Sequence, residues 1–224
     1  PLIESTLGRL SDVRVLVFAP GATPEAAAMP NRTERPKMTV GQAALIALMD
    51  RYLKGLLDPF VSLLEIHKLM YFLQAAGQPL RLQYEAREFG PYAKNLRQVL
   101  IRLESHYTQG YGDGRDSPTK PIELLPGVAE EAQAFLQDDQ VIRQRMERVT
   151  DLIEGYEDPV GLELLSSVHW VMSLNPEARL SASAAARAVH EWNARKRRTR
   201  KTEHLTKAWQ HLTGKGWIPA EATA

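Results

Sequence analysis

The sequence contains no cysteine. Without cysteine, disulfide bonds, zinc sites built from thiolates and a cysteine nucleophile are all excluded. The sequence also lacks an apolar run of the roughly 20 residues that a membrane-spanning helix needs, and its first residues lack the charged and then apolar pattern of a signal peptide. We therefore expect a cytoplasmic protein that does not contact a membrane.

A dominant charge of one sign is also missing. The 28 lysine and arginine residues are balanced by 27 aspartate and glutamate residues, which leaves a net charge of +1. Charge gathers only locally, in a basic run at residues 195–201 and in acidic stretches at residues 137–139 and 154–158. A chain of 224 residues with ordinary globular composition is long enough for one packed domain and a short appendage.

Patterns that carry catalysis or metal binding are lacking too. No two histidines have the four-residue spacing that places two metal ligands on one face of a helix. The glycines at positions 110, 112 and 114 resemble a phosphate-binding loop only in glycine content. The pairs Glu85 with Glu88 and Asp113 with Asp116 have the residue types for acid–base chemistry, but solvated surface carboxylates are far commoner. We therefore expect no enzyme, no metal and no cofactor. The six histidines are His67, His106, His169, His190, His204 and His211.

The chain divides into segments of different character. Residues 1–20 predict a helix followed by a strand, residues 21–36 carry three prolines without an apolar stripe, and residues 220–224 form a tail. One helix and one strand bury too little surface to be stable alone. We interpret residues 1–20 as the end of an upstream α/β domain, residues 21–36 as a linker and residues 37–219 as a single helical domain.

Within residues 37–219, apolar residues recur mainly at helical spacing. A first helix is expected from a cap at Thr39 to Gly55, a second from a cap at Asp58 to about residue 76, and a strand over residues 80–86. A helix over residues 92–106 and a long glycine-rich loop come before a strand at residues 122–125. The predicted fold is therefore mainly α with a small β element. The remaining helices are expected at residues 127–136, 139–154, 159–174, 181–196 and 202–212.

The turn Phe-Gly-Pro-Tyr at residues 89–92 and the polar loop after the next helix form the candidate functional surface. Aromatic rings mixed with hydrogen-bonding groups are typical of binding surfaces. A plain alternative is that Phe89 and Tyr92 are core residues and that the Gly-Pro pair only turns the chain. The residues expected to contact a partner are Tyr84, Glu85, Arg87, Glu88, Tyr92, Lys94, Asn95, Tyr107, Tyr111, Asp113 and Asp116.

The basic run at residues 195–201 offers a second candidate surface, because clustered lysine and arginine bind phosphates. Trp192 and Trp209 flank it, and a helix, a basic turn and a helix also make up DNA-reading units. Against this, amphipathic helices commonly place tryptophan in the core and basic residues at a solvated C-terminal end. We favour the interpretation that the basic run is a solvated helix end, and direct binding of nucleic acid is not expected.

Three segments together resemble the C-terminal domain of DarG antitoxins: HKLMYFLQ at residues 67–74, FGPYAKNL at residues 89–96, and residues 104–114. More loosely, the Lys-Leu-x-Tyr helix followed by Gly-Pro is similar to Panacea-type antitoxin domains. The resemblance covers residues 37–219. It also suits residues 1–20, which look like the final helix and strand of the macrodomain that precedes this domain in DarG.

The resemblance implies a domain of a toxin–antitoxin system that binds and inhibits a DarT-type toxin, a DNA-modifying ADP-ribosyltransferase, in a one-to-one complex. It implies that the domain occupies the toxin's single-stranded DNA groove as a DNA mimic, with carboxylates in place of phosphates and aromatic rings in place of bases. The groups expected to do this are Glu85, Glu88, Asp113, Asp116, Tyr107 and Tyr111.

The resemblance also bears on catalysis. In DarG the macrodomain removes ADP-ribose from thymidine in DNA, and its binding loops would lie before Pro1, so no hydrolase activity is expected in this chain. Two alternatives stay open. One is a DNA-binding module that uses the basic C-terminal helices, and the other is an enzyme fragment that still removes ADP-ribose from DNA.

Overall fold

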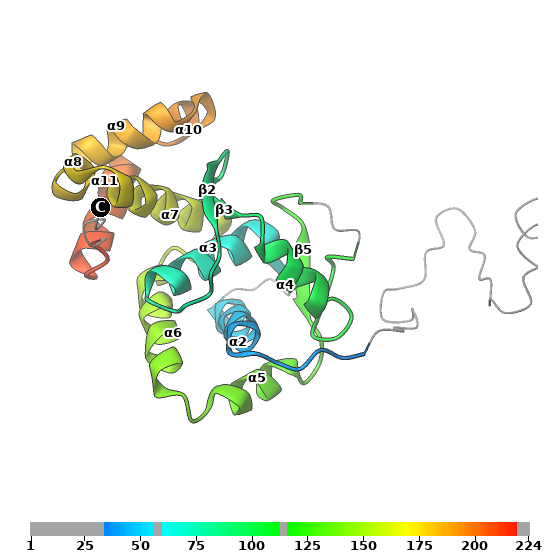
Figure 1. The fold of residues 1–224 in the computed structure, drawn as a ribbon. Coiled ribbons are helices and arrows are strands. Elements are labelled where there is room, and N and C mark those ends of the chain that lie inside the picture. The colour runs from blue at the N-terminus through cyan, green and yellow to red at the C-terminus, as the bar shows by residue number, and fades with distance from the viewer. Residues whose placement is uncertain (1–33, 56–59, 113–115, 219–224) are drawn as a thin grey trace, which may run out of the picture. The chain divides into compact units, whose positions relative to one another are not determined.

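The protein is described by a computed structural model over residues 34–55, 60–112 and 116–218 (Figure 1). Within these ranges the fold is mainly helical with a few short strands, as predicted. No helix in the described part of the chain is long and apolar enough to cross a membrane. The helix and strand expected over residues 1–20, most of the linker, the cap at Asp58 and the final tail lie outside the described residues.

Two helices form the centre of the core, α2 (Val40–Gly55) and α3 (Leu63–Ala75). Helices α5 (Val128–Leu136) and α6 (Gln140–Ile153) pack against α2; α6 also packs against α3, and α2 lies between α5 and α3 (Figure 1). Helix α3 buries every residue from 65 to 73. A helix that is buried on all sides places any charged residue it carries inside the protein.

Local caps set where the central helices begin. Thr39 N–H donates to Gln42 Oε1 at 3.0 Å, and Gln42 N–H donates to Thr39 Oγ1 at 3.4 Å, so the predicted cap of α2 is confirmed. Helix α3 starts from Ser62, whose Oγ accepts from the Glu65 N–H at 3.3 Å, while Glu65 Oε2 accepts from the Ser62 N–H at 2.7 Å. This reciprocal capping box stands where the sequence predicted the helix interior.

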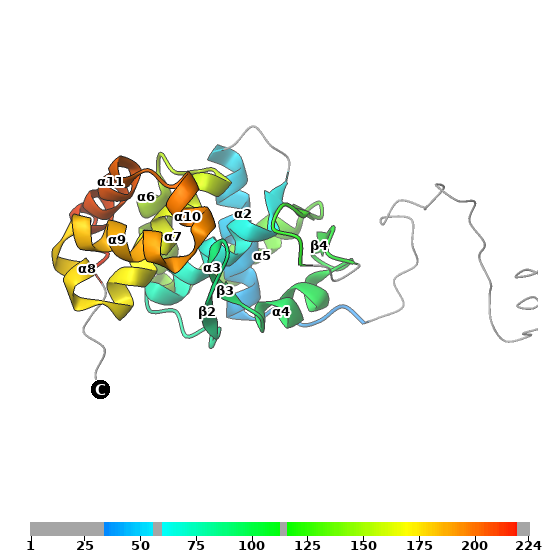
Figure 2. The same cartoon turned by 90° about the horizontal axis from the view of Figure 1, so that it is seen from above.

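Helix α7 (Pro159–Leu174) packs against α3 and leads to the C-terminal helices (Figure 2). Asp158 caps it, as predicted, since its Oδ1 accepts from the N–H groups of Val160 and Gly161 at 2.7 and 2.9 Å. The helices that follow are α8 (Pro176–Leu180), α9 (Ala182–Trp192), α10 (Ala194–Thr199) and α11 (Thr202–Gly214).

The single helix expected over residues 181–196 is in fact two helices, α9 and α10. Asn193 separates them: its backbone is extended, with φ −163° and ψ 165°, and its Oδ1 accepts from the Lys196 N–H at 2.8 Å. The sequence carries no proline or glycine at this point, so Asn193, a favoured N-cap residue, is the local signal of the break. The break lets α10 take a new direction that brings Arg195 and Lys196 to Glu163 on α7.

Among the described residues, short strands form two small antiparallel sheets. Strand β5 (Pro121–Leu124) lies between β1 (Val61–Ser62) and β4 (Thr108–Gln109). Strands β2 (Tyr84–Arg87) and β3 (Gly90–Ala93) form a hairpin in which Arg87 lies opposite Gly90. In Figure 1 the hairpin reaches from α3 toward α10.

The hairpin corrects the expectation of one strand over residues 80–86 and a helix from residue 92. The helix, α4 (Leu96–Leu103), begins only after β3. The two-residue loop Glu88-Phe89 lacks the Asn-Gly or Asp-Gly pair that usually announces a tight hairpin, so the sequence did not reveal it. Gly90 follows the loop with φ +101°, a backbone conformation that residues other than glycine rarely adopt.

Candidate functional site

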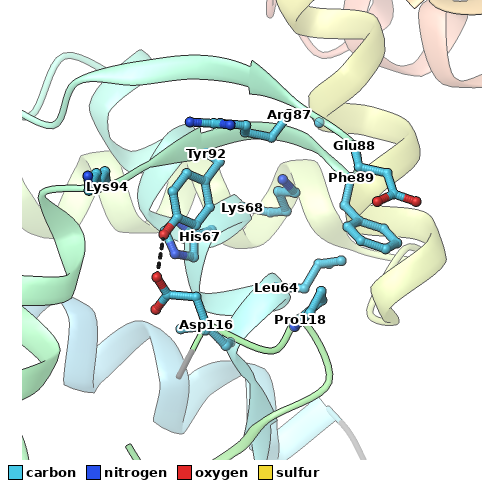
Figure 3. Close-up of a pocket in the computed structure, with 12 residues that line it drawn as sticks. Leu64, His67, Lys68, Arg87, Glu88, Phe89, Tyr92, Lys94, Asp116 and Pro118 are labelled. Carbon is cyan, nitrogen blue, oxygen red and sulfur yellow. Dashed lines mark hydrogen bonds between the residues drawn. The ribbon is translucent and has the colours of Figure 1, made fainter. Parts of the chain in front are cut away.

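A pocket of about 640 Å³ opens between α3, the β2–β3 hairpin and the segment that carries Asp116 (Figure 3). Its volume falls in the range of small-molecule sites. We call it the Lys68 pocket. Its lining residues are Leu63, Leu64, His67, Lys68, Arg87, Glu88, Phe89, Gly90, Tyr92, Lys94, Asp116 and Pro118.

Lys68 is the buried cation of the pocket. It is 2% exposed, and its Nζ donates a hydrogen bond to the carbonyl oxygen of Pro91 at 2.7 Å. Burial, helped by the charge of Lys196 and opposed by that of Glu163, lowers the pKa of Lys68 to about 7. At neutral pH the amine therefore exchanges between its charged and neutral forms.

His67 supports the ring of Tyr92. The two rings stack with their centroids 4.4 Å apart, and His67 Nδ1 accepts a hydrogen bond from the Ala93 N–H at 3.4 Å. Burial, together with the charge of Lys68, lowers the pKa of His67 to about 3. The imidazole is therefore uncharged at neutral pH, and it holds the hairpin against α3.

Asp116 accepts hydrogen bonds from two tyrosines. Tyr92 Oη donates to its Oδ2 at 2.9 Å, a bond drawn in Figure 3, and Tyr111 Oη donates to its Oδ1 at 2.6 Å. Arg97 lies 4.0 Å from the same carboxylate. Burial, followed by the bond to Asp116, raises the pKa of Tyr92 to about 12. Asp116 is thus engaged by protein donors, which weakens it as a general base.

Close to Lys68, three cations surround one buried carboxylate, that of Glu163 on α7. Arg195 donates two hydrogen bonds to it, at 2.8 and 3.0 Å, Lys196 Nζ lies 2.7 Å from Oε1, and Arg200 lies 2.6 Å from Oε2. Burial alone would raise the pKa of Glu163, but the hydrogen bonds from Arg195 and Lys196 and the charges of Lys196 and Arg200 lower it to about 2. We call these four residues the Glu163 cluster.

Arg195 connects the Glu163 cluster to the pocket. Its guanidinium lies over the ring of Phe89, 4.3 Å from the centroid, and its Nε is 4.0 Å from Glu88 Oε1. Asn193 Nδ2 donates to the carbonyl oxygen of Glu88 at 3.2 Å. The hairpin loop is therefore fastened to the start of α10.

The Glu163 cluster changes the interpretation of the basic run. Lys196 and Arg200 are buried, and together with Arg195 they neutralise an internal carboxylate. The expectation that the basic run is the solvated end of a helix is therefore wrong for these residues, because a buried carboxylate needs paired cations. Half of the six basic residues in the run thus pair with Glu163, which weakens the DNA-binding alternative. The exposed members are Arg197, Arg198 and Lys201.

The structure brings together in the Lys68 pocket a subset of the residues expected to contact a partner. Arg87, which is one of them, pairs with Glu85 at 2.6 Å, and Glu85 itself does not line the pocket. The expected residues that line the pocket are Arg87, Glu88, Tyr92, Lys94 and Asp116. Asp113 lies outside the described residues.

Tyr84 and Asn95 mainly support the fold. Tyr84 packs edge-on against Tyr71 with ring centroids 5.1 Å apart. Asn95 Oδ1 accepts from the Gln83 N–H at 3.0 Å, and its Nδ2 donates to the carbonyl oxygen of Arg81 at 2.9 Å. Asn95 thereby anchors the segment that precedes β2.

Tyr107 and Tyr111 are buried, with 2% and 1% of their surface exposed. Tyr107 Oη donates to the carbonyl oxygen of Pro36 at 2.7 Å. The expectation of an exposed aromatic surface at these two residues is therefore corrected, because a ring buried to this degree has no open face for a base. The sequence assigned them to a loop region, whereas the structure packs them beside strand β4.

Sequence analysis did not single out His67, Lys68 or Glu163 as site residues. All three lie on helices whose apolar pattern directs their positions into the core. A charged or titratable residue at such a position requires a partner or a function. That interruption of the apolar pattern is the signal that could have revealed them.

No protein-family model matches this chain. Curated relatives do match it. The chain is 37% identical over 219 residues to a Thermus aquaticus protein named DNA ADP-ribosyl glycohydrolase, with 98% of this chain and 59% of the relative covered. It is 33% identical over 208 residues to proteins of the same name from Mycobacterium bovis and Mycobacterium tuberculosis, with 88% of this chain and 58% of each relative covered. The chain thus spans about three fifths of the length of the curated relatives it matches.

These relatives carry the name of an enzyme, and this corrects three expectations. The chain was expected to be no enzyme, to be the C-terminal toxin-binding domain of DarG, and to act by blocking a DarT-type toxin; the relatives contradict all three. Two of the three motifs behind these expectations, residues 67–74 and 89–96, supply lining residues of the Lys68 pocket, so they mark this pocket without specifying its activity. The connection to ADP-ribosylation that the resemblance gave agrees with the names of the relatives.

Proposed function

We propose that this chain takes part in removing ADP-ribose from DNA, as a segment of a DNA ADP-ribosyl glycohydrolase. The observation that carries the proposal is the match of 98% of the chain, at 37% identity, to a protein of that name. Because the chain spans about three fifths of such relatives, the activity of the whole protein is itself part of the proposal.

The chemistry of the Lys68 pocket supports the proposal. Removing ADP-ribose breaks the bond between the anomeric carbon of a sugar and a DNA base, and water supplies a hydroxyl to the sugar and a proton to the base. The sugar is attached to a diphosphate, so the protein must hold an anion. Lys68 and Lys94 supply positive charge to a pocket of suitable size.

The titratable groups of the pocket suit a role in holding the substrate. Asp116 is engaged by the hydroxyls of Tyr92 and Tyr111, and burial lowers the pKa of His67 to about 3. Lys68, whose pKa burial lowers to about 7, is the lining group that exchanges a proton near neutral pH. We therefore assign the pocket to substrate binding, with Lys68 as its main cation.

The test is an assay of ADP-ribose release. An oligonucleotide that carries ADP-ribose on one base is incubated with the purified chain, and free ADP-ribose is measured over time. We expect release above the protein-free control, and tighter binding of this oligonucleotide than of its unmodified counterpart.

A companion assay uses the Thermus aquaticus relative with the segment that matches this chain deleted. We expect the deletion to slow the release of ADP-ribose, and circular dichroism checks that the remaining part stays folded. No release by the chain, together with an unchanged rate in the deletion variant, contradicts the proposal whatever binding is observed.

A further inference from the structure

A second pocket, of about 580 Å³, opens between the start of α2, the segment that joins α3 to β2, and helices α4 and α6. We call it the Gln42 pocket. It shares no lining residue with the Lys68 pocket, so an inference about it does not depend on the proposed function. Its volume is in the range of small-molecule sites. Its apolar lining residues are Val40, Met70, Leu80, Leu82, Leu96 and Val99.

Two buried amides in the lining each keep a donor group available. Gln42 is 7% exposed and Gln78 is 8% exposed. Each uses its Oε1 inside the protein: that of Gln42 accepts from the Thr39 N–H at 3.0 Å, and that of Gln78 accepts from Arg145 Nη1 at 2.7 Å. Neither Nε2 donates a hydrogen bond within the described part of the chain, and neither is among the fully enclosed polar atoms that lack a partner. Both Nε2 groups are therefore accessible donors at the pocket.

Two arginines and one carboxylate also line the Gln42 pocket. Arg145 on α6 is half-buried, and Gln78 is its hydrogen-bond partner. Arg102 on α4 is exposed and has no ion-pair partner among the described residues. The carboxylate is that of Asp139, which caps α6 because its Oδ1 accepts from the Ile142 N–H at 3.1 Å. Two cations and one carboxylate leave the pocket with a net charge of +1.

We propose that the Gln42 pocket binds a small carboxylic acid as its anion, with the carboxylate beside Arg145 and the amides of Gln42 and Gln78, and with an apolar body against the apolar lining. A carboxylate suits this place because amide and guanidinium N–H groups donate to it, and the bonds from arginine are charge-assisted. Its single negative charge offsets the net charge of +1, whereas a phosphate monoester carries more. Burial of the hydrocarbon part is favourable in itself.

The experiment is an NMR titration of the full chain with 4-phenylbutyrate, which joins a flat apolar ring to one carboxylate. For a ligand of this size we expect a dissociation constant on the order of 1 mM or below. The side-chain amide signals of Gln42 and Gln78 should shift as the ligand is added, because their N–H groups gain an acceptor. No shift of these signals at about 10 mM ligand overturns the inference.

Matched ligands separate the charge from the apolar body. The alcohol 4-phenylbutanol keeps the ring and the chain and lacks the charge, while acetate keeps the carboxylate and lacks the ring. We expect each to bind at least about tenfold more weakly than 4-phenylbutyrate, since each forgoes one of the two contributions. An alcohol or an acetate that binds as tightly as 4-phenylbutyrate overturns the inference.

Variants locate the carboxylate. In Arg145→Met we expect the affinity for 4-phenylbutyrate to fall by about tenfold, as befits a lost charge-assisted bond, and the affinity for 4-phenylbutanol to stay unchanged. The matched control is Arg143→Met, which removes an exposed arginine of the same helix that does not line the pocket; it should bind both ligands as the parent does. Equal affinities of the two variants for 4-phenylbutyrate overturn the inference.

A second pair of variants applies if Arg145→Met does not fold, which thermal unfolding verifies. Arg102→Met removes the exposed cation of the pocket, and Val99→Glu adds a negative charge at a half-buried position of its lining. Both should weaken the binding of 4-phenylbutyrate, because both make the pocket less positive. Unchanged affinity in both variants overturns the inference.

Two further competitors test other occupants of the Gln42 pocket. One is an uncharged apolar tetrapeptide, acetylated and amidated at its ends, and the other is a single-stranded oligonucleotide. We expect neither to displace 4-phenylbutyrate. A tetrapeptide that competes with similar affinity assigns the pocket to a segment of a protein partner, and an oligonucleotide that does so assigns it to nucleic acid. Either result overturns the inference.

Discussion

Lys196 lies entirely inside the protein, and its Nζ is 2.7 Å from Oε1 of Glu163. The same carboxylate also binds Arg195 and Arg200, so three cations depend on one anion. Removing charged groups from water is unfavourable unless each has a partner. Loss of the Glu163 charge would therefore leave the buried cations Lys196 and Arg200 without compensation.

Replacing this carboxylate by an amide, in Glu163→Gln, retains its shape and removes its charge. We expect the free energy of unfolding to fall by roughly 3–5 kcal/mol, because buried cations then lack their counter-charge. Urea denaturation measures the change. The matched control is Glu203→Gln, which breaks an exposed pair with Lys207 and should have no measurable effect. Similar losses in the two variants would contradict the importance of burial in the Glu163 cluster.

Acid should weaken the protein through the same residue. The pKa of Glu163 is about 2 in the folded protein, where hydrogen bonds and cations outweigh burial, against 4.5 without these surroundings. Because the folded pKa is the lower one, the stabilisation is fully present above pH 4.5 and is lost as the pH falls toward 2. Free energies of unfolding measured from pH 6 downward should therefore decline more steeply for the parent than for Glu163→Gln. Parallel curves would refute this.

Stability should rise with pH on the alkaline side because of Lys68. Burial lowers its pKa from 10.5 to about 7, so between these values the unfolded chain binds more protons than the folded one. The free energy of unfolding should then increase by up to about 1.4 kcal/mol per pH unit. Urea denaturation between pH 7 and pH 9.5 checks this, with Lys68→Met expected to give a flatter profile. The same slope in that variant would assign the effect to another group.

Substituting Gly90 should destabilise the hairpin and fill part of the Lys68 pocket. Gly90 has φ +101°, and a Cβ placed on it would lie 3.1 Å from Ser167 Oγ and 3.3 Å from Lys68 Nζ. We expect Gly90→Ala to lower the free energy of unfolding by about 1–3 kcal/mol. Gly214→Ala, at a position with no atom within 4 Å of the new Cβ, serves as the control and should be close to neutral. Equal stability of the two variants would contradict the prediction.

The parts of the fold that depend on neighbouring residues are predictable from the sequence. Thr39 caps α2 and Asp158 caps α7 through bonds that join residues two or three positions apart. Such caps can be recognised from a few consecutive residues of the sequence. The β2–β3 hairpin does not, because its loop Glu88-Phe89 has no turn signature and its structure depends on packing against α3 and α7.

The site is predictable only in part, for a related reason. Sequence reasoning selected the hairpin side of the Lys68 pocket, where polar and aromatic residues stand close together in the chain. It could not pair Glu163 with Arg200, which lies 37 residues further along, and so it assigned the basic run to solvent. It also assigned an activity from motifs in α3 and β3, whose residues line the Lys68 pocket but do not by themselves specify what the pocket binds.

Arg195 links the hairpin loop to the core, because it contacts both Phe89 and Glu163. Its guanidinium bonds to Glu163 and covers the ring of Phe89. If Phe89 moves, Arg195 either loses its contact with the ring or follows the ring and leaves Glu163. The latter movement removes one of the cations that compensate the buried carboxylate. The hairpin side of the pocket should therefore act as a fixed wall with slow hydrogen exchange. We then expect ligands to enter and leave over Pro118, on the side of the pocket opposite the hairpin. Movement on that side would set the rates of ligand binding and release.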